Sequence, residues 1–184
     1  MPLEHEGSAK GLLDKFLQTR RPDDFEPVVR AHADQLYRVI CRIVHNQHDT
    51  EDLVQDTMLR AYEKIDTFKG NAKFSTWLCQ IGVNLAITFL RRKKRYVLSD
   101  SVESDAAWPD KRAWTTEVNE EVGRVHRAIA RLSAKLRAVL VLSVVEEMPI
   151  DEIAQILKCP KPTVYWRLHQ ARGILRRTLE AGNG

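Results

Sequence analysis

The segment from residue 74 to residue 95 constrains the fold more than any other part of the chain. It reads FSTWLCQIGVNLAITFLRRKKR, and polar residues interrupt its apolar run at every fourth position, at Gln80, Asn84 and Thr88. This period predicts one long α-helix with a single polar stripe, which the cations of residues 91–95 extend. The apolar part is shorter than the roughly 20 residues of a membrane-spanning helix. We therefore exclude direct membrane insertion.

The rest of the chain is also predicted to be helical. Apolar residues recur at helical spacing over residues 24–44 and again over residues 49–65. Residues 115–131 predict another helix, and Ser133 can cap one that runs to about residue 145. The stretch VLVLSVV within it would suit a buried strand by local propensity, but its helical neighbours favour a helix. We therefore expect an all-α protein.

One short segment divides the chain into two predicted domains. Residues 96–114 are rich in Ser, Asp and Ala and show no helical period, which is typical of a flexible linker. Basic residues outnumber acidic ones over residues 21–95 and 115–184, whereas the linker is acidic. We predict an N-terminal extension over residues 1–20, followed by two small helical domains on either side of this linker.

Cysteine content and the N-terminal residues narrow the class of protein. The three cysteines are far apart and lack C-x-x-C spacing, so neither a disulfide framework nor a zinc site is predicted. The first 20 residues contain acids and no long apolar core, so they do not resemble a signal peptide. We expect a cytoplasmic protein without a metal or cofactor. Its net charge of +4 favours an anionic partner.

Residues 150–177 predict a helix-turn-helix. A short helix over residues 150–157 is followed by a turn at residues 158–161 and by a helix with Pro162 at its first position. No Asp or Glu occurs between Ile153 and Leu179, as expected for a helix that lies between the phosphates of a DNA groove. A solvated helix of an ordinary bundle is the alternative. The side chains predicted to contact the groove are Thr163, Tyr165, Trp166, Arg167, His169 and Gln170.

The acidic residues at the start of the predicted helix over residues 49–65 have three interpretations. Acids are common in the first turn of a helix, where they interact favourably with the helix dipole. Asp52 and Asp56 share one helical face, so with Asp49 they could instead bind the metal of a nuclease. The third interpretation is a protein-docking face, in which these acids lie beside exposed Leu53 and Met58.

The composition of the loop before the predicted helix of residues 74–95 indicates binding of single-stranded nucleic acid. Phe68, Lys69, Lys73 and Phe74 lie next to the polar stripe in the sequence. Cations hold phosphates, while aromatic rings and amides receive unstacked bases. Within the helix itself, we treat Trp77 as a core residue, together with Phe89.

Two sequence blocks resemble bacterial sigma factors of the extracytoplasmic function (ECF) group. DTEDLVQDTMLRAYEKIDTFKG, followed by FSTWLCQIGVNLAITFLRR, resembles their second conserved region. MPIDEIAQILKCPKPTVYWRLHQARGILRR resembles their fourth region. The resemblance covers residues 20–95 and 120–180. It implies a transcription initiation factor without enzymatic activity, which recruits RNA polymerase core to promoters and helps to open them.

The resemblance also implies partners and site residues. The clamp helices of the polymerase β′ subunit would bind a helix that carries Asp49, Asp52, Leu53, Gln55 and Asp56. The other expected protein partners are the β flap of polymerase and an anti-sigma factor, either soluble or membrane-bound. Residues 162–177 would read the minus-thirty-five element. The residues expected at the minus-ten element are Phe68, Lys69, Asn71, Lys73, Phe74, Asn84, Arg91, Arg92 and Arg95.

The predicted recognition helix departs from the family pattern. Pro162 stands where the family usually has Gly, Tyr165 and Trp166 replace a basic and a small residue, and Gln170 replaces a common Arg. The usual minus-thirty-five sequence is therefore not assumed. Two rivals remain open: a stand-alone helix-turn-helix regulator, which leaves residues 49–95 unexplained, and the metal-dependent nuclease.

Overall fold

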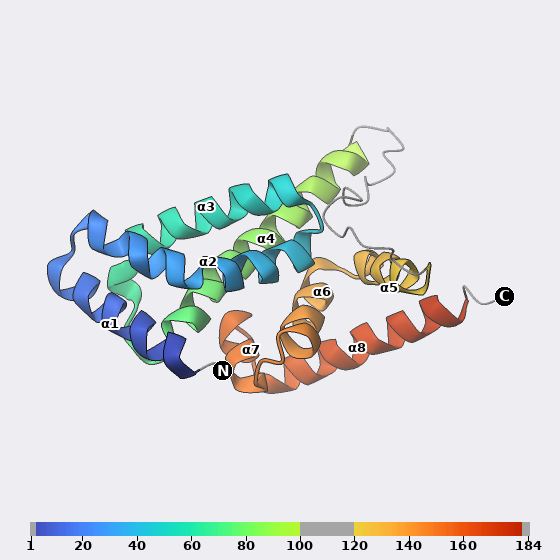
Figure 1. The fold of residues 1–184 in the computed structure, drawn as a ribbon. Helices are drawn as coiled ribbons and strands as arrows, with labels where there is room; N and C mark the ends of the chain where they lie inside the picture. The colour runs from blue at the N-terminus through green and yellow to red at the C-terminus, as the bar shows by residue number, and fades with distance from the viewer. Residues whose placement is uncertain (1–2, 100–119, 182–184) are drawn as a thin grey trace.

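The computed structural model describes residues 3–99 and 120–181, and within these ranges all regular structure is helical (Figure 1). The all-α prediction is therefore confirmed. The elements are α1 (Leu3–Thr19), α2 (Pro22–Val44), α3 (Gln47–Glu63), a 3₁₀ turn (Ile65–Thr67), α4 (Phe74–Ser99), α5 (Glu120–Arg131), α6 (Ala134–Leu140), a π-helical turn (Val141–Val145), α7 (Ile150–Ile156) and α8 (Lys161–Glu180).

Capping residues set the boundary between α2 and α3. Helix α2 ends at His45, whose left-handed φ of 59° turns the chain. Asn46 then caps α3, and its side-chain oxygen accepts a hydrogen bond from the backbone N–H of Asp49 at 2.8 Å. Helix α3 thus begins two residues before the predicted start at Asp49, which lies inside the first turn instead. Helix α2 similarly begins at Pro22 rather than at Asp24.

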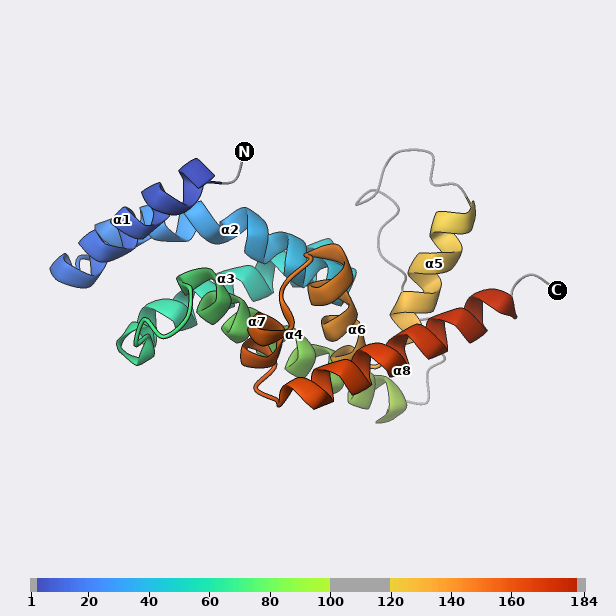
Figure 2. The same cartoon turned by 90° about the horizontal axis from the view of Figure 1, so that it is seen from below.

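The predicted N-terminal extension forms α1, which packs along α2 (Figure 2). Leu13 and Phe16 are buried, and the Phe16 ring centroid lies 4.8 Å from that of Phe25 on α2. These apolar contacts make α1 part of the same helical bundle as α2, α3 and α4, hereafter the N-terminal bundle.

Helix α4 occupies the centre of the molecule. It contacts α2 and α3 on one side and α6 and α7 on the other. A Cβ atom at Gly82 would lie only 2.8 Å from Leu36 Cδ1 and 3.2 Å from Thr57 Oγ1, so α4 approaches α2 and α3 closely at this glycine. This close packing places the polar stripe of α4 on the side that faces away from α2.

The C-terminal bundle, α5 to α8, packs directly on the N-terminal bundle (Figures 1 and 2). Buried apolar residues form one cluster that runs through both bundles, including Ile40, Val83, Val139 and Ile156. Ser133 caps α6 as predicted, accepting from the Leu136 N–H at 3.5 Å. The stretch VLVLSVV is helical, although its second part widens into a π-helical turn.

The predicted linker lies mostly outside the described residues. Helix α4 continues to Ser99, so the first four residues of the predicted linker are helical. The remainder of the linker, 100–114, and the first five residues of the predicted second domain, 115–119, fall outside the described ranges. The proposed domain boundaries at residues 20, 95 and 114 stay predictions.

Candidate polymerase and nucleic-acid interfaces

Helix α3 carries an exposed acidic face. Asp52, Gln55 and Asp56 are exposed, and so is Leu59, at 65% of its maximal surface. These residues lie at positions i, i+3, i+4 and i+7, so they share one side of the helix. We call these four residues the docking face. Because the docking face combines negative charge with the exposed side chain of Leu59, it is suited to binding another protein.

Two residues predicted for this face have other positions. Leu53 is only 6% exposed and belongs to the apolar core, so the prediction of an exposed Leu53 is wrong. Met58 is half-buried rather than exposed. Helical periodicity explains both, because the apolar residue on the solvent side is Leu59, two turns beyond Asp52. The sequence reasoning missed Leu59. Asp49 is held by Lys93 of α4, with its Oδ2 2.8 Å from the lysine Nζ.

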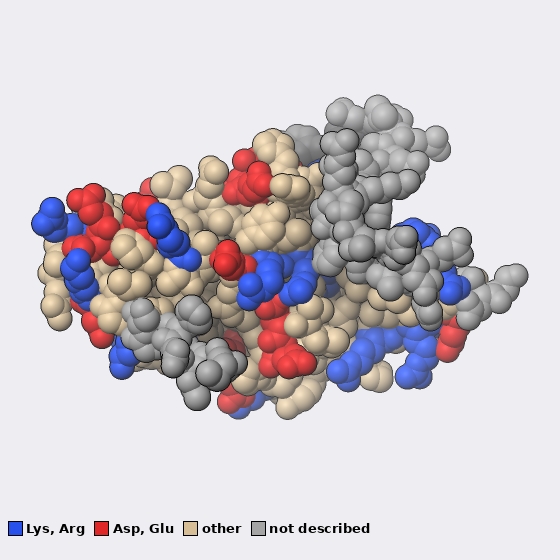
Figure 3. All heavy atoms as spheres, viewed as in Figure 1, with Lys and Arg blue, Asp and Glu red and all other residues tan. Residues whose placement is uncertain are grey.

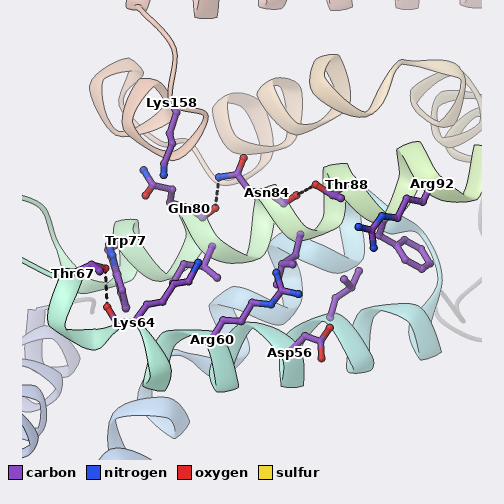
Figure 4. A pocket seen from close by; sticks show the side chains of 14 residues that line it. Asp56, Arg60, Lys64, Thr67, Trp77, Gln80, Asn84, Thr88, Arg92 and Lys158 are labelled. Carbon is purple, nitrogen blue, oxygen red and sulfur yellow. Dashed lines mark hydrogen bonds between the residues drawn. The ribbon is translucent and has the colours of Figure 1, made fainter.

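A polar groove lies between α3 and α4 (Figure 4). It encloses a cavity of about 380 Å³. Helix α3 contributes Asp56 and Arg60, and the polar stripe of α4 contributes the other wall, as Figure 4 shows. The α4 residues that line this groove include Trp77, Gln80, Asn84, Thr88, Phe89 and Arg92. The predicted stripe thus faces a concave surface, and Trp77 and Phe89 contribute to it despite being predicted as core.

Local hydrogen bonds order the polar stripe. Asn84 Nδ2 donates to the backbone oxygen of Gln80 at 2.7 Å, and Thr88 Oγ1 donates to that of Asn84 at 2.8 Å. Both side chains are exposed. The stripe therefore presents amide and hydroxyl groups in defined orientations, as a surface that binds bases requires.

A second and larger cavity lies beside residues 68–75, which comprise the loop and the first two residues of α4. It has a volume of about 920 Å³, and α1 forms its opposite wall through Lys10 and Leu17. Lys69, Asn71 and Lys73 are exposed on the loop. Sequence reasoning had no signal for the contribution of α1, because its position depends on tertiary packing.

The aromatic residues of the loop are less available than predicted. Phe74 is only 7% exposed, and its ring centroid lies 5.5 Å from those of both Phe68 and Trp77. The prediction that Phe74 contacts DNA therefore does not fit its burial, whereas Phe68 is only half-buried. His32 packs on Phe74 at 5.2 Å, and burial lowers the pKa of this histidine.

The structure separates the loop from Asn84. The loop residues line the larger cavity and Asn84 lines the polar groove, so they do not form one pocket. The predicted cations Arg91, Arg92 and Arg95 are exposed near the end of α4. A strand of nucleic acid that contacts all of these groups would have to follow α4 along its length.

The helix-turn-helix of residues 150–180 is present. Tyr165 and Trp166 are each 59% exposed on α8, and His169 is exposed on the following turn. Thr163, Arg167 and Gln170 are half-buried, and Arg167 Nη1 donates to Cys159 Sγ in the turn at 3.5 Å. Figure 3 shows Lys and Arg side chains gathered over α8. The exposed face of α8 is therefore aromatic and basic.

Metal-binding clusters and membrane-spanning helices are absent from residues 3–99 and 120–181. In this part of the chain, no group of three or more His, Cys, Asp or Glu side chains is arranged to hold a metal ion. No helix there is both long and apolar enough to cross a membrane.

Two stretches of the chain match models of protein families. Residues 28–96 match sigma-70 region 2, and residues 123–175 match sigma-70 region 4. The ECF RNA polymerase sigma factor SigW of Bacillus subtilis is 33% identical to the chain over 170 residues, which cover 85% of the chain and 89% of SigW. The chain belongs to the ECF sigma factors. It is therefore a transcription initiation factor and not an enzyme, as the resemblance implied.

Other sigma factors match over a similar span. RNA polymerase sigma-H factor of Pseudomonas aeruginosa is 28% identical over 169 residues, covering 85% of this sigma factor and 86% of that one. The structure of the sigma factor RpoE in complex with the anti-sigma factor NepR, from Bartonella quintana, superimposes with a TM-score of 0.65 at 25% identity. It covers 85% of this chain and 97% of RpoE. Region 2 thus lies in the N-terminal bundle and region 4 in the C-terminal bundle.

Proposed function

We propose that the docking face of α3 binds the clamp helices of the polymerase β′ subunit. The observation that carries this proposal is the exposure of Asp52, Gln55, Asp56 and Leu59 on one side of a helix in region 2. An exposed leucine next to polar and acidic side chains is typical of a protein interface with an apolar centre and a polar rim. Region 4 would then reach the β flap of the same polymerase.

The minus-ten element would bind along α4. The polar groove presents Asn84 and Thr88, and the cations Arg91, Arg92 and Arg95 extend this surface toward the end of the helix. The cavity between α1 and the loop has room for an unstacked base beside Phe68, Lys69 and Asn71. Unstacking a base costs a few kcal/mol, which stacking, amide contacts and phosphate neutralisation would offset.

The minus-thirty-five element would be read by α8. Tyr165, Trp166 and His169 are the most exposed of the predicted contact residues, whereas Arg167 is tied to the turn through Cys159. Aromatic side chains in the major groove can contact thymine methyl groups. The remaining predicted contacts are Thr163 and Gln170, at the edges of this face.

An anti-sigma factor is the proposed regulator. RpoE, which has the same fold, was solved in complex with the anti-sigma factor NepR. The docking face and the aromatic face of α8 both expose apolar side chains that such a protein could cover. We place the activity in the cytoplasm, where bacterial polymerase transcribes. Both a soluble and a membrane-bound anti-sigma factor fit this proposal.

The test adds purified protein to RNA polymerase core and a promoter library, followed by sequencing of the transcripts. We expect initiation that requires both core and this protein, at promoters with shared minus-ten and minus-thirty-five sequences. Absence of core-dependent initiation would contradict the proposal. Operator binding without core would favour a stand-alone regulator, and magnesium-dependent cleavage of the library would favour a nuclease.

A further inference from the structure

Tyr165 and Trp166 are the only Phe, Tyr or Trp residues between residues 120 and 181, and both lie at the surface. They are adjacent on α8, and more than half of each side chain is exposed. Aromatic side chains of this size usually bury most of their apolar area in a core or an interface. Two exposed rings side by side therefore indicate a surface that a partner covers.

The charge along α8 indicates that this partner is anionic. The helix carries no Asp or Glu before Glu180. Arg172 and Arg176 are exposed one and two turns beyond His169, on the same side of the helix as the two rings. Figure 3 shows the cations gathered over α8. A protein partner would need acids opposite these arginines, whereas duplex DNA presents phosphates on both sides of its major groove.

The cations nearest the two rings are engaged elsewhere. Arg167 is half-buried, and its Nη1 donates to Cys159 Sγ in the turn at 3.5 Å. Lys161 Nζ pairs with Asp151 Oδ1 at 2.6 Å. The other exposed residues of the first two turns include no lysine or arginine. They are Pro162, Tyr165, Trp166 and His169. Bidentate arginine or lysine contacts are the commonest way to read guanine, so these turns instead offer apolar rings to the bases.

Packing fixes the side of α8 on which the two rings lie. Val164, Leu168 and Ala171 are buried and form one apolar stripe at helical spacing. Helix α8 therefore cannot rotate to bury either ring without exposing this stripe. In a helix-turn-helix, the N-terminal residues of the second helix contact base edges. Tyr165 and Trp166, in the first two turns of α8, occupy such positions.

We propose that Tyr165 and Trp166 read the C5-methyl groups of thymine in the minus-thirty-five element, while Arg172 and Arg176 hold the adjacent phosphates. This inference rests on the proposed reading of that element by α8, and it names the base feature on which the reading depends. The thymine methyl is an apolar group in the major groove, so its contact with an aromatic ring removes apolar surface of both from water. Thymines rather than guanines then determine the preference of these two turns.

Deoxyuridine tests this inference, because it pairs as thymine does but lacks the C5-methyl group. Holoenzyme assembled from core and the full-length protein is titrated with two duplexes of a promoter that it transcribes. The duplexes differ only in whether the minus-thirty-five element contains thymine or deoxyuridine. At constant salt concentration, we expect the deoxyuridine duplex to bind about fourfold more weakly for each contacted methyl group. A control duplex with deoxyuridine only in the spacer between the two promoter elements should bind as the unmodified duplex does.

Trp166→Ala and Tyr165→Ala should each remove the sensitivity to deoxyuridine at one thymine. Each variant should bind the unmodified promoter more weakly, and deoxyuridine at that thymine should then cause no further loss. Arg176→Gln is the matched control on the same side of α8. It should weaken both duplexes by the same factor and reduce the slope of log K against log[salt] by about one. The deoxyuridine comparison needs no variant, so it stands even where a substitution disturbs α8.

Equal binding of the thymine and deoxyuridine duplexes by the unmodified holoenzyme would overturn the inference, and so would transcribed promoters whose minus-thirty-five element lacks thymine. Undiminished promoter binding by both alanine variants would also overturn it and would assign the two rings to a protein partner. The proposed function fails separately, through loss of core-dependent initiation across the promoter library. A holoenzyme that initiates normally but does not respond to the methyl groups would refute methyl reading alone.

Discussion

Lys93 Nζ lies 2.8 Å from Asp49 Oδ2 and joins the basic end of α4 to the first turn of α3. Only 20% of the Asp49 side chain is exposed, whereas Asp52 on the next turn is exposed. Asp49 and Asp52 therefore have different roles, although both belong to one acidic sequence motif. Asp49 stabilises the bundle, and Asp52 is available to a partner.

We expect Asp49→Asn to lower the free energy of unfolding by about 1 kcal/mol, because it removes a partly buried ion pair and a favourable interaction with the α3 dipole. Asp52→Asn should leave stability nearly unchanged and weaken the binding of polymerase core by about 1 kcal/mol or more. Urea unfolding and titration of labelled core separate the two effects. Equal loss of core affinity in both variants, with equal stability, would contradict this division.

Leu53 and Leu59 form a second contrasting pair on α3. Leu53→Ala should destabilise the fold by about 2 to 5 kcal/mol, because Leu53 is only 6% exposed and its truncation leaves a cavity. Leu59→Ala, at a residue 65% exposed, should change stability by less than about 0.5 kcal/mol but weaken core binding. Thermal unfolding and core titration measure both quantities. Normal core binding by Leu59→Ala would remove Leu59 from the docking face.

Asn84→Ala should reduce promoter opening or relax selectivity at the minus-ten element, while core affinity stays unchanged. The exposed amide is the polar group of the groove best suited to hydrogen-bond an unstacked base. Permanganate footprinting of the opened strands measures promoter opening. Thr88→Val, one turn away on the same stripe, tests whether the neighbouring hydroxyl of the groove also contributes to promoter opening. A parallel loss of core binding in Asn84→Ala would contradict the assigned role.

Two helical glycines should respond to alanine in opposite directions. A Cβ at Gly82 would meet Leu36 Cδ1 at 2.8 Å, so Gly82→Ala forces the buried Leu36 side chain or the helices themselves to shift and should cost about 1 to 3 kcal/mol of stability. Gly173 in α8 has no atom within 4 Å of its added Cβ, so Gly173→Ala should stabilise by about 0.5 to 1 kcal/mol. Thermal unfolding of the two variants tests both signs. Equal effects would contradict the close approach at Gly82.

Stability should fall at alkaline pH partly because of Cys79. Burial, with Glu146 and Glu152 nearby, raises the pKa of its thiol from 9.0 to about 12. The unfolded chain therefore loses this proton at a lower pH than the folded protein. The contribution of Cys79 is complete below pH 9.0 and declines as pH rises toward about 12.

Urea unfolding at neutral pH and near pH 10.5 measures this linkage. The loss of stability between the two should be smaller in Cys79→Ala than in the unmodified protein. Cys159→Ala, at a half-buried cysteine in the turn before α8, is the matched control and should keep the full dependence. An identical pH dependence in Cys79→Ala would show that the thiol does not contribute.

Much of the fold was predictable because local signals agreed. The fourfold polar spacing of Gln80, Asn84 and Thr88 predicted α4 and its stripe, and both are present. Ser133 predicted the start of α6, and Pro162 the first turn of α8. Helix caps and periodicity act over a few residues, so they can be read without knowledge of distant contacts. The helix starts predicted at Asp24 and Asp49 were each two residues late, because the helices begin at Pro22 and Gln47. Neighbouring residues also satisfied the first-turn pattern.

The sequence by itself determined the helices, their order, the polar stripe of α4, the basic face of α8 and the sigma-factor motifs, because each depends on residues close together in the chain. Long-range packing determined which face of α3 is covered, so that Leu53 is buried and Leu59 exposed, and it placed Phe74 in the core. It alone placed Glu146 beside Arg42 and Gln155 beside Gln80, residues far apart in sequence. Such contacts follow from how whole helices bury their apolar faces against each other, and no local pattern encodes them.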